Sequence, residues 1–361
     1  TTIQHKAFPV IMSGRDVCGI AQTGTGKTFA YLLPSLRLMK FSKTRAVQML
    51  ILVPTLELVI QVVEAIKKLT THMTLEVDGV YGGTNINPQK TRVENGSDIL
   101  VATPGRLLDL ALDGSLNMKM IKKLVIDEVD EMLNLGFRTQ LKNILDLLPE
   151  KRQNLLVSAT ITDDVEKLMQ VYFNDPVKIE AAPTGTPLEN IDQAEYDVPN
   201  FYTKVNLLTL LLNSDADMSR VLVFVGTKQL ADQLYEQLET KFPGEAGVIH
   251  SNKAQNYRFN AVKQFQDGNY RFLIATDIVA RGIDVAEVSH VINFDTPEVA
   301  ETYIHRIGRT GRADKKGIAI TFITQKEKKL QVNIEALMHR TIPVLPLPDG
   351  LEISDVLTED E

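Results

Sequence analysis

The 361-residue sequence holds one cysteine and no apolar run near the length that crosses a bilayer. A single cysteine, Cys18, excludes an internal disulfide, and its apolar neighbours predict a small buried side chain. A spanning helix needs about 20 consecutive apolar residues, so a transmembrane class is not expected. No stretch has the pattern of a secretory signal peptide. These absences favour a globular protein of a reducing, cytoplasmic compartment.

The sequence also lacks the basic excess typical of modules that bind a nucleic-acid duplex. It holds 39 Lys and Arg against 46 Asp and Glu, a net charge of −7. The charge is unevenly distributed. Residues 1–183 hold 21 basic and 20 acidic residues, whereas six acidic residues gather in 349–361. A cleft with a few well-placed phosphate contacts is therefore still compatible with the composition.

Two halves of the chain share one rhythm, in which short apolar runs alternate with amphipathic segments. This alternation predicts an α/β fold of two tandem domains, each a mostly parallel sheet flanked by helices. We expect the domains at 1–183 and 184–350, joined near 181–190, with a frayed acidic tail at 351–361. The strands are expected at 17–21, 49–53, 98–102, 123–127, 154–158, 220–225, 246–250, 271–275, 290–294 and 317–323.

Residues 21–28, Ala-Gln-Thr-Gly-Thr-Gly-Lys-Thr, follow a predicted strand and open a predicted helix. A phosphate-binding loop needs this context, because glycines let backbone N–H groups converge on an anion at the positive end of a helix. The strict pattern begins with Gly, where Ala21 stands here. Lys27 would reach the β- and γ-phosphates, and the Thr28 hydroxyl would hold Mg²⁺. The alternative is a Gly-rich turn that only caps a helix.

An acidic stretch, Asp127-Glu128-Val129-Asp130, follows the apolar run 124–126. An acid at the carboxyl end of a parallel strand, beside the phosphate loop, is where the Mg²⁺ partner of that loop belongs. Asp127 would hold the metal directly or through water, and Glu128 would orient or deprotonate the attacking water. The alternative is a solvated acidic turn.

Residues 305–312, His-Arg-Ile-Gly-Arg-Thr-Gly-Arg, place three arginines at intervals of three, so one helical face can present them together. The bland interpretation is a solvated basic face. Gly308 and Gly311 are poor helix formers, however, and indicate a close approach of chains. Arginine beside a γ-phosphate stabilises the charge of phosphoryl transfer. Such fingers in the second domain would make catalysis depend on closure of the two domains.

These stretches, taken together, resemble the motifs of DEAD-box RNA helicases of superfamily 2 over nearly the whole chain. In family order, the Q motif end is matched by 2–4, motif I by 21–28, Ia by 54–58, the double glycine by 82–83, Ib by 103–106, II by 127–130, III by 158–160, IV by 224–227, the Gln-x-x-Arg element by 255–258, V by 276–284 and VI by 305–312. The resemblance implies two RecA-like domains. The short two-domain core with its brief tail resembles the bacterial RhlE-like subgroup.

The resemblance implies ATP and Mg²⁺ as cofactors and a monomer that binds single-stranded RNA through its backbone, with little sequence preference. For ATP it implies Gln4, which would read adenine, with Ala21, Thr23, Gly24, Thr25, Gly26, Lys27, Thr28, Asp127, Asp284, Arg309 and Arg312. The implied catalytic residues are Lys27, Glu128, Arg309 and Arg312, and the implied Mg²⁺ ligands are Thr28 and Asp127. Asp130, Ser158, Thr160 and His305 would couple the sites. The implied RNA contacts are Thr55, Gly83, Gly105, Arg106, Thr227, Gln255, Arg258 and Thr276.

Three features depart from the family pattern. Val129 replaces the Ala of motif II, a change of two methyl groups that we expect the packing to tolerate. Leu56 stands where motif Ia has an RNA-contacting arginine, so one charge-assisted contact is expected to be missing. The adenine-stacking aromatic of the family would precede Thr1, which leaves selectivity for ATP open.

The sequence therefore predicts an ATP-dependent RNA helicase that unwinds short duplexes or remodels RNA–protein complexes. An alternative within the family is an ATP-locked RNA clamp that barely turns over. A P-loop kinase would not need the arginines of the second domain. A DNA-dependent ATPase stays open, because contacts to the 2′-hydroxyl leave no mark in a sequence.

Overall fold

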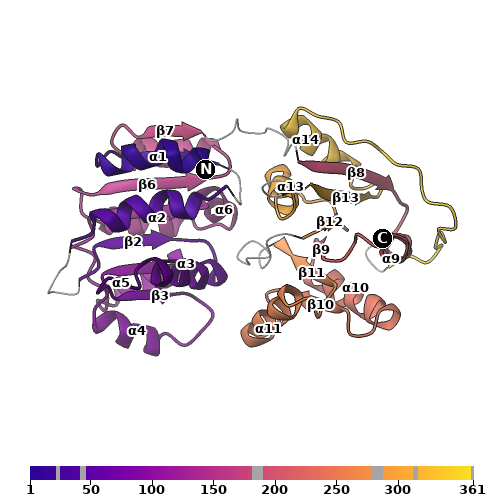
Figure 1. Ribbon diagram of the computed structural model, residues 1–361, viewed down its shortest axis with the longest axis horizontal. Helices are drawn as coiled ribbons and strands as arrows, with labels where there is room; N and C mark the ends of the chain where they lie inside the picture. The colour runs from indigo at the N-terminus through magenta and orange to yellow at the C-terminus, as the bar shows by residue number, and fades with distance from the viewer. Residues whose placement is uncertain (22–24, 41–45, 181–189, 278–287, 312–315, 359–361) are drawn as a thin grey trace. The chain divides into compact units, whose positions relative to one another are not determined.

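The computed structural model of the chain describes residues 1–21, 25–40, 46–180, 190–277, 288–311 and 316–358. It divides into two compact units, Thr1–Thr184 and Gly185–Glu361 (Figure 1). All but one of the residues of the expected joint, 181–190, lie outside the described residues. The boundaries expected at 183 and 350 therefore stay predictions.

The first unit holds a parallel sheet whose described strands run in the order β3-β4-β2-β5-β6-β1-β7. Its strands are β1 (Val17–Ile20), β2 (Met49–Leu52), β3 (Val77–Val80), β4 (Ile99–Ala102), β5 (Lys123–Asp127), β6 (Gln153–Ser158) and β7 (Val177–Glu180). Its helices are α1 (Thr2–Met12), α2 (Lys27–Leu38), α3 (Leu56–Leu69), α4 (Asn87–Glu94), α5 (Pro104–Leu112), α6 (Val129–Asn134), α7 (Arg138–Leu147) and α8 (Asp163–Tyr172).

Alternate residues of each strand in the first unit feed a core on each face of the sheet. In β2, Leu50 and Leu52 pack with the apolar side chains of α5 to α8, whereas Met49 and Ile51 pack with those of α1 to α3. Cys18 is fully buried in the first of these cores, as its apolar neighbours predict. Two covered faces explain why the central strands are continuous apolar runs.

The second unit holds another parallel sheet, in the order β10-β11-β9-β12-β13-β8. Its strands are β8 (Ile191–Asp197), β9 (Val221–Val225), β10 (Ala246–Ile249), β11 (Phe272–Thr276), β12 (His290–Asn293) and β13 (Gly317–Ile323). Its helices are α9 (Phe201–Ser214), α10 (Lys228–Lys241), α11 (Gln255–Gln266), α13 (Ala300–Ile307) and α14 (Lys328–Met338). It too has a core on each face, one with α9 and α10 and the other with α11, α13 and α14.

The two strand orders superimpose, because β3-β4-β2-β5-β6-β1 of the first unit corresponds in place to β10-β11-β9-β12-β13-β8 of the second. The prediction of two similar α/β domains is therefore confirmed. The ten expected strands are all present, with ends that differ by at most a residue or so.

Three strands have no counterpart in the sequence prediction: β3, β7 and β8. Each lies at an edge of its sheet. Edge strands often carry charged side chains, which block pairing with another chain, and the two edge strands β3 and β7 are only partly buried. Val77-Asp78-Gly79-Val80 therefore gives too weak an apolar signal for detection, and Val177-Lys178-Ile179-Glu180 is half charged.

The expectation of a frayed tail from residue 351 is wrong for its first residues. The Nδ2 atom of Asn200 donates to the Ser354 carbonyl at 2.6 Å, and Asn206 Nδ2 donates to the Glu352 carbonyl at 3.0 Å. The Ser354 N–H donates to Thr203 Oγ1 at 3.0 Å. These bonds attach the acidic segment to the start of α9.

Within the described residues, no helix combines the length and the apolar character that a membrane crossing requires.

Candidate active site

Most of the described residues that the sequence selects lie at or near one edge of each sheet. In a parallel sheet all strands end at the same edge, and ligands bind there. In the first unit, Thr55, Gly83 and Gly105 follow the neighbouring strands β2, β3 and β4, whereas Asp127 and Ser158 end β5 and β6. The edge therefore divides into a part with phosphate-loop chemistry at β5, β6 and β1 and a part with hydroxyls and glycines at β3, β4 and β2.

The end of the phosphate loop lies against α1. Gly26 has φ of 87°, a left-handed conformation that favours glycine, and it precedes the first residue of α2. Its carbonyl accepts a hydrogen bond from Gln4 Nε2 at 3.1 Å. A Cβ at residue 26 would lie 2.6 Å from that nitrogen, which is the end of a flexible side chain, so the positive φ and not this contact is what favours glycine. Thr23 and Gly24 lie outside the described residues.

Lys27 and Asp127 are buried beside this loop. Lys27 is 7 % exposed, and its Nζ finds no hydrogen-bond partner among the described residues. Asp127 is 6 % exposed and accepts a hydrogen bond at Oδ2 from the Tyr31 hydroxyl, at 2.9 Å. Its Oδ1 finds no partner in the same part of the chain. A buried ammonium and a buried carboxylate oxygen left without partners are costly unless a ligand satisfies them.

Burial sets the pKa of both members of the Asp127–Tyr31 pair. Desolvation raises the pKa of the Asp127 carboxyl, while Lys27 and the Tyr31 hydroxyl act in the opposite direction. Burial and the neighbouring carboxylate raise the pKa of Tyr31 well above its ordinary value. Tyr31 therefore stays a neutral donor that stabilises the carboxylate form of Asp127.

Glu128 has a left-handed backbone, with φ of 55° and ψ of 48°, at the N-cap position of α6. Non-glycine residues adopt this conformation rarely and at a cost, and such residues cluster at functional sites. Its neighbour Val129 is fully buried in the core, so the packing accommodates the larger side chain, as expected.

Asp130 joins the acidic stretch to the end of β6. Its Oδ2 accepts hydrogen bonds from the Ala159 N–H at 3.2 Å, the Thr160 N–H at 3.0 Å and Thr160 Oγ1 at 2.9 Å. Ser158 Oγ donates to the Thr160 carbonyl at 2.6 Å. Three of the four predicted coupling residues therefore form one buried network within the first unit.

The expected RNA contacts of the first unit fall into two kinds. Thr55 caps α3, its Oγ1 accepting from the Leu58 N–H at 3.4 Å, so the start of this helix lies next to the end of β2. Gly83 has φ of 80°, and a Cβ at Gly83 or Gly105 would meet no atom, so both glycines border open space.

Arg106 is largely buried beside the double-glycine turn, and its Nε and Nη1 find no hydrogen-bond partner among the described residues, so its RNA contact stays a prediction. It is 8 % exposed, and its Nη2 donates to the Thr84 carbonyl at 2.8 Å. Gln89, which no sequence motif singles out, donates from Nε2 to Thr84 Oγ1 at 2.8 Å and to the Tyr81 carbonyl at 3.1 Å. Arg106 and Gln89 thus support the double-glycine turn from within the unit.

Motif VI corrects the expectation of one helical face with three arginines. The helix α13 ends at Ile307, with Gly308 as its C-cap, so Arg309 lies beyond it. Arg306 is 2 % exposed and pairs with both oxygens of Asp277, at 2.6 and 2.8 Å. The close approach expected at Gly311 is present, because a Cβ there would lie 2.4 Å from Ile191 Cγ1.

The other described residues that the sequence predicts for the second unit lie at or near the carboxyl edge of its sheet. His305 and Arg309 are 7 % and 6 % exposed, and Thr276 ends β11. Thr227 caps α10, its Oγ1 accepting from the Leu230 N–H at 3.1 Å, as Thr55 caps α3. Gln255 and Arg258 lie on the first turn of α11, three residues apart on one face. Asp284 and Arg312 lie outside the described residues.

Family models agree with this arrangement of motifs. A DEAD/DEAH box helicase model matches residues 1–168, and a helicase conserved C-terminal domain model matches residues 203–314. The RNA helicase CrhR of Synechocystis sp. is 40 % identical over 357 residues, covering 98 % of this chain and 71 % of that protein. The chain belongs to the DEAD-box family of ATP-dependent RNA helicases.

Further DEAD-box relatives extend the comparison. The DEAD-box ATP-dependent RNA helicase CshA of Geobacillus kaustophilus is 40 % identical over 350 residues, covering 96 % of this chain and 74 % of that protein. The CshA of Bacillus cereus is 38 % identical over 348 residues, covering 96 % and 66 %. The chain thus spans about two thirds to three quarters of these relatives. The RhlE-like subgroup stays a prediction.

Solved DEAD-box structures have the same fold. Saccharomyces cerevisiae Dbp5, bound to RNA and ADP BeF3, matches with a TM-score of 0.85 at 29 % identity, over 97 % of this chain and 90 % of that one. Mss116p, bound to single-stranded RNA and AMP-PNP, matches with a TM-score of 0.86 at 28 % identity, over 97 % and 75 %.

Proposed function

We propose that this DEAD-box protein hydrolyses ATP in response to single-stranded RNA and uses the cycle to unwind short duplexes or remodel RNA–protein complexes. The observation that carries the proposal is the pair of buried, unpartnered atoms beside the phosphate loop, Lys27 Nζ and Asp127 Oδ1, within the described residues. A triphosphate with its metal ion would satisfy both.

The side chains fit Mg²⁺, which binds through one or two protein oxygens and keeps several waters. Asp127 Oδ1 and the Thr28 hydroxyl would hold it. Mg²⁺, when bound, neutralises charge that develops on the β- and γ-phosphates.

In this proposal, the site residues of the first unit have separate roles. Lys27 binds the phosphates, and Glu128 orients the attacking water and takes its proton. The left-handed backbone of Glu128 supports this role, because non-glycine residues in that conformation cluster at functional sites. The bonds from Asp130 to residues 159 and 160 would transmit a shift of the acidic stretch to the end of β6.

Hydrolysis is proposed to need both units. Arg309 would stabilise charge on the transferred phosphate, and His305 would take part in coupling. Asp284 and Arg312 complete this set in the proposal.

The RNA is proposed to bind by its backbone at the N-capped starts of α3 and α10 and at the double-glycine turn. Helix starts bind phosphates through N–H groups without net charge, which supports RNA binding by a chain of charge −7. Because these groups contact phosphate and sugar, we expect little sequence preference.

The test is steady-state ATPase activity without polynucleotide, with single-stranded RNA and with DNA of the same sequence. We expect stimulation by RNA above that by DNA, followed by ATP-dependent unwinding of a short RNA duplex. Turnover below about 0.01 per second in saturating RNA, against typical enzyme rates near 10 per second, would indicate the clamp instead. The clamp is not favoured by the relatives, which are named helicases.

A further inference from the structure

The second unit has a lysine and an aspartate on the elements that correspond to those of Lys27 and Asp127 in the first unit. The strand β12 corresponds in sheet order to β5, and Asp295 follows β12 closely as Asp127 ends β5. The helix α9 follows β8 as α2 follows β1, and it carries Lys204 as α2 carries Lys27. In the second unit, however, this lysine and this aspartate bind each other, Lys204 Nζ lying 3.1 Å from Asp295 Oδ1.

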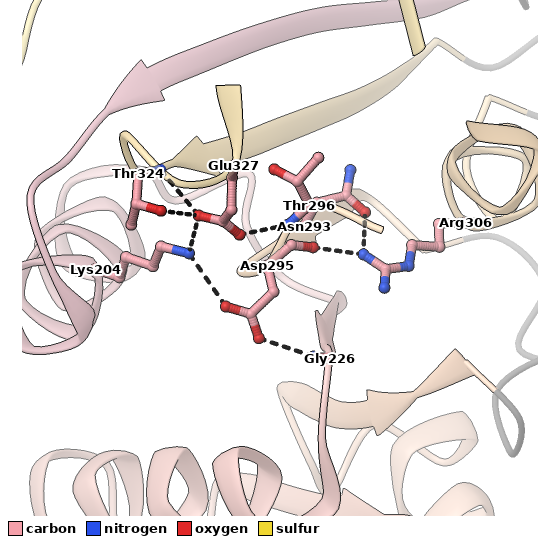
Figure 2. A network of polar contacts seen from close by, with 8 residues as sticks. All are labelled: Lys204, Gly226, Asn293, Asp295, Thr296, Arg306, Thr324 and Glu327. Carbon is pink, nitrogen blue, oxygen red and sulfur yellow. Dashed lines mark hydrogen bonds and ion pairs between the residues drawn. The ribbon is translucent and has the colours of Figure 1, made fainter. Parts of the chain in front are cut away.

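The pair belongs to a larger charged network (Figure 2). Lys204 Nζ also lies 2.8 Å from Glu327 Oε2, and the lysine side chain is only 4 % exposed. Glu327 accepts hydrogen bonds from the Thr296 N–H at 2.8 Å and the Thr324 N–H at 2.9 Å. One cation therefore joins two carboxylates that follow β12 and β13.

The second carboxylate oxygen of Asp295 contacts the turn after β9. Asp295 Oδ2 accepts the Gly226 N–H at 2.8 Å (Figure 2). Gly226 directly precedes Thr227, the N-cap of α10. Arg306 Nη1 donates to the Asp295 carbonyl at 2.6 Å, so the same residue also contacts motif VI.

We infer that Asp295, held by Lys204, is a positioning residue for RNA binding, which fixes the Gly226–Thr227 turn so that the start of α10 meets the RNA backbone. The inference rests on the proposed RNA contact at Thr227. None of the motifs of the sequence analysis contains Lys204 or Asp295. In the second unit, the position that corresponds to the nucleotide site thus holds an internal set of contacts, Lys204–Asp295–Gly226, which we call the brace.

The geometry separates this role from general stability. Asp295 and Glu327 pair with the same ammonium at 3.1 and 2.8 Å, and their side chains are 18 % and 14 % exposed. Loss of either charge leaves Lys204 with one partner, and Glu327→Gln also weakens the bonds from Thr296 and Thr324, so it is expected to cost at least as much stability as Asp295→Asn. Only Asp295 also accepts the Gly226 N–H. Glu327→Gln is therefore the matched control for Asp295→Asn.

In Asp295→Asn, either rotamer of the amide fails. If the amide oxygen faces Gly226, the NH₂ group faces the Lys204 ammonium, and two donors then meet. In the reverse rotamer the NH₂ group faces the Gly226 N–H, which is again a donor. We expect Asp295→Asn to raise the RNA concentration for half-maximal ATPase about tenfold, with kcat at saturating RNA within twofold. Glu327→Gln should change that concentration less than threefold. Equal shifts in the two variants, or none in either, would overturn the inference.

A double variant gives an independent test. In Lys204→Met with Asp295→Asn, the amide can present its oxygen to Gly226 and its NH₂ group to no cation. We expect the half-maximal RNA concentration to return to within threefold of the unmodified protein. A folded double variant that stays as weak as Asp295→Asn would contradict the brace.

Hydrogen exchange tests the brace without RNA. The Gly226 amide should exchange at least tenfold faster in Asp295→Asn than in Glu327→Gln, and equal protection would refute the inference even if a variant binds RNA poorly. If the unmodified protein shows no RNA-stimulated ATPase, the proposed function fails, whereas the exchange result still decides the brace.

Discussion

Substitution of Tyr31 by Phe tests the proposed Mg²⁺ site at Asp127. The Tyr31 hydroxyl donates to Asp127 Oδ2 at 2.9 Å, although the two residues are 96 positions apart in the sequence. The Thr28 hydroxyl contacts it as well. With Oδ2 occupied by Tyr31, Oδ1 is the oxygen left for Mg²⁺ among the described contacts. Phe keeps the ring and removes only the donor.

The magnitude follows from the burial of the bond. A hydrogen bond to a charged group contributes about 1.5–3 kcal/mol, which corresponds to about 10- to 100-fold in an equilibrium constant. Burial already raises the pKa of Asp127, and the Tyr31 bond opposes that shift. Without it the pKa rises further, so less carboxylate is present at a given pH. The KM for Mg·ATP should increase about 10-fold or more, and the acid limb of kcat/KM should move to higher pH.

The assay is RNA-stimulated ATPase across pH 5 to 8 at several Mg·ATP concentrations. Tyr172→Phe is the matched control, because the Tyr172 hydroxyl donates to Asp146 Oδ1 at 2.8 Å in an exposed position. It should leave KM and the acid limb unchanged, since exposed polar pairs contribute little. An unchanged KM and acid limb in Tyr31→Phe would refute the assigned role of Asp127.

Three further predictions concern other parts of the first unit. Glu128→Gln should abolish hydrolysis and leave a persistent complex with ATP and RNA; release of RNA at the normal rate would argue against Glu128 as the base. Leu56→Arg should tighten RNA binding about tenfold at fixed salt, because it adds a charge-assisted contact at the start of α3; equal affinities would show that no phosphate lies there. Lys123→Met should raise the free energy of unfolding at pH 7 by as much as about 3 kcal/mol, because burial lowers the pKa of Lys123 to about 8 and the charged form costs stability below that pH. In the unmodified protein, the stability lost to the charged Lys123 is regained as the pH rises from about 8 to 10.5. Urea unfolding at pH 7 and at about pH 10.5 measures this difference, with the exposed Lys122→Met as control.

The sequence was sufficient for features with a local signal. Central strands such as β2 and β5 are continuous apolar runs because both faces of the sheet are covered, and the phosphate loop has its own spacing. The corresponding motifs therefore lie at the carboxyl edges, where they were expected. The edge strand β3, by contrast, contains Asp78 and Gly79 and gives no such run.

Other parts of the site could not be predicted, because their partners are distant in sequence. Tyr31 and Asp127 lie 96 residues apart, and Lys204 and Asp295 lie 91 apart. The sequence of an amphipathic helix does not indicate which distant residue its buried tyrosine or lysine will contact. The arginine spacing of motif VI suggested one helical face, but Gly308 ends the helix and Arg306 pairs with Asp277.

The central claim is that hydrolysis needs residues from both units. Each unit has its own sheet with a core on each face, so residues 1–184 and 185–361 can be prepared separately. The direct measurement is ATPase activity of the whole chain and of each part, with and without single-stranded RNA. We predict RNA-stimulated turnover by the whole chain and less than about one hundredth of it by either part. Full, RNA-independent hydrolysis by residues 1–184 alone would contradict the account.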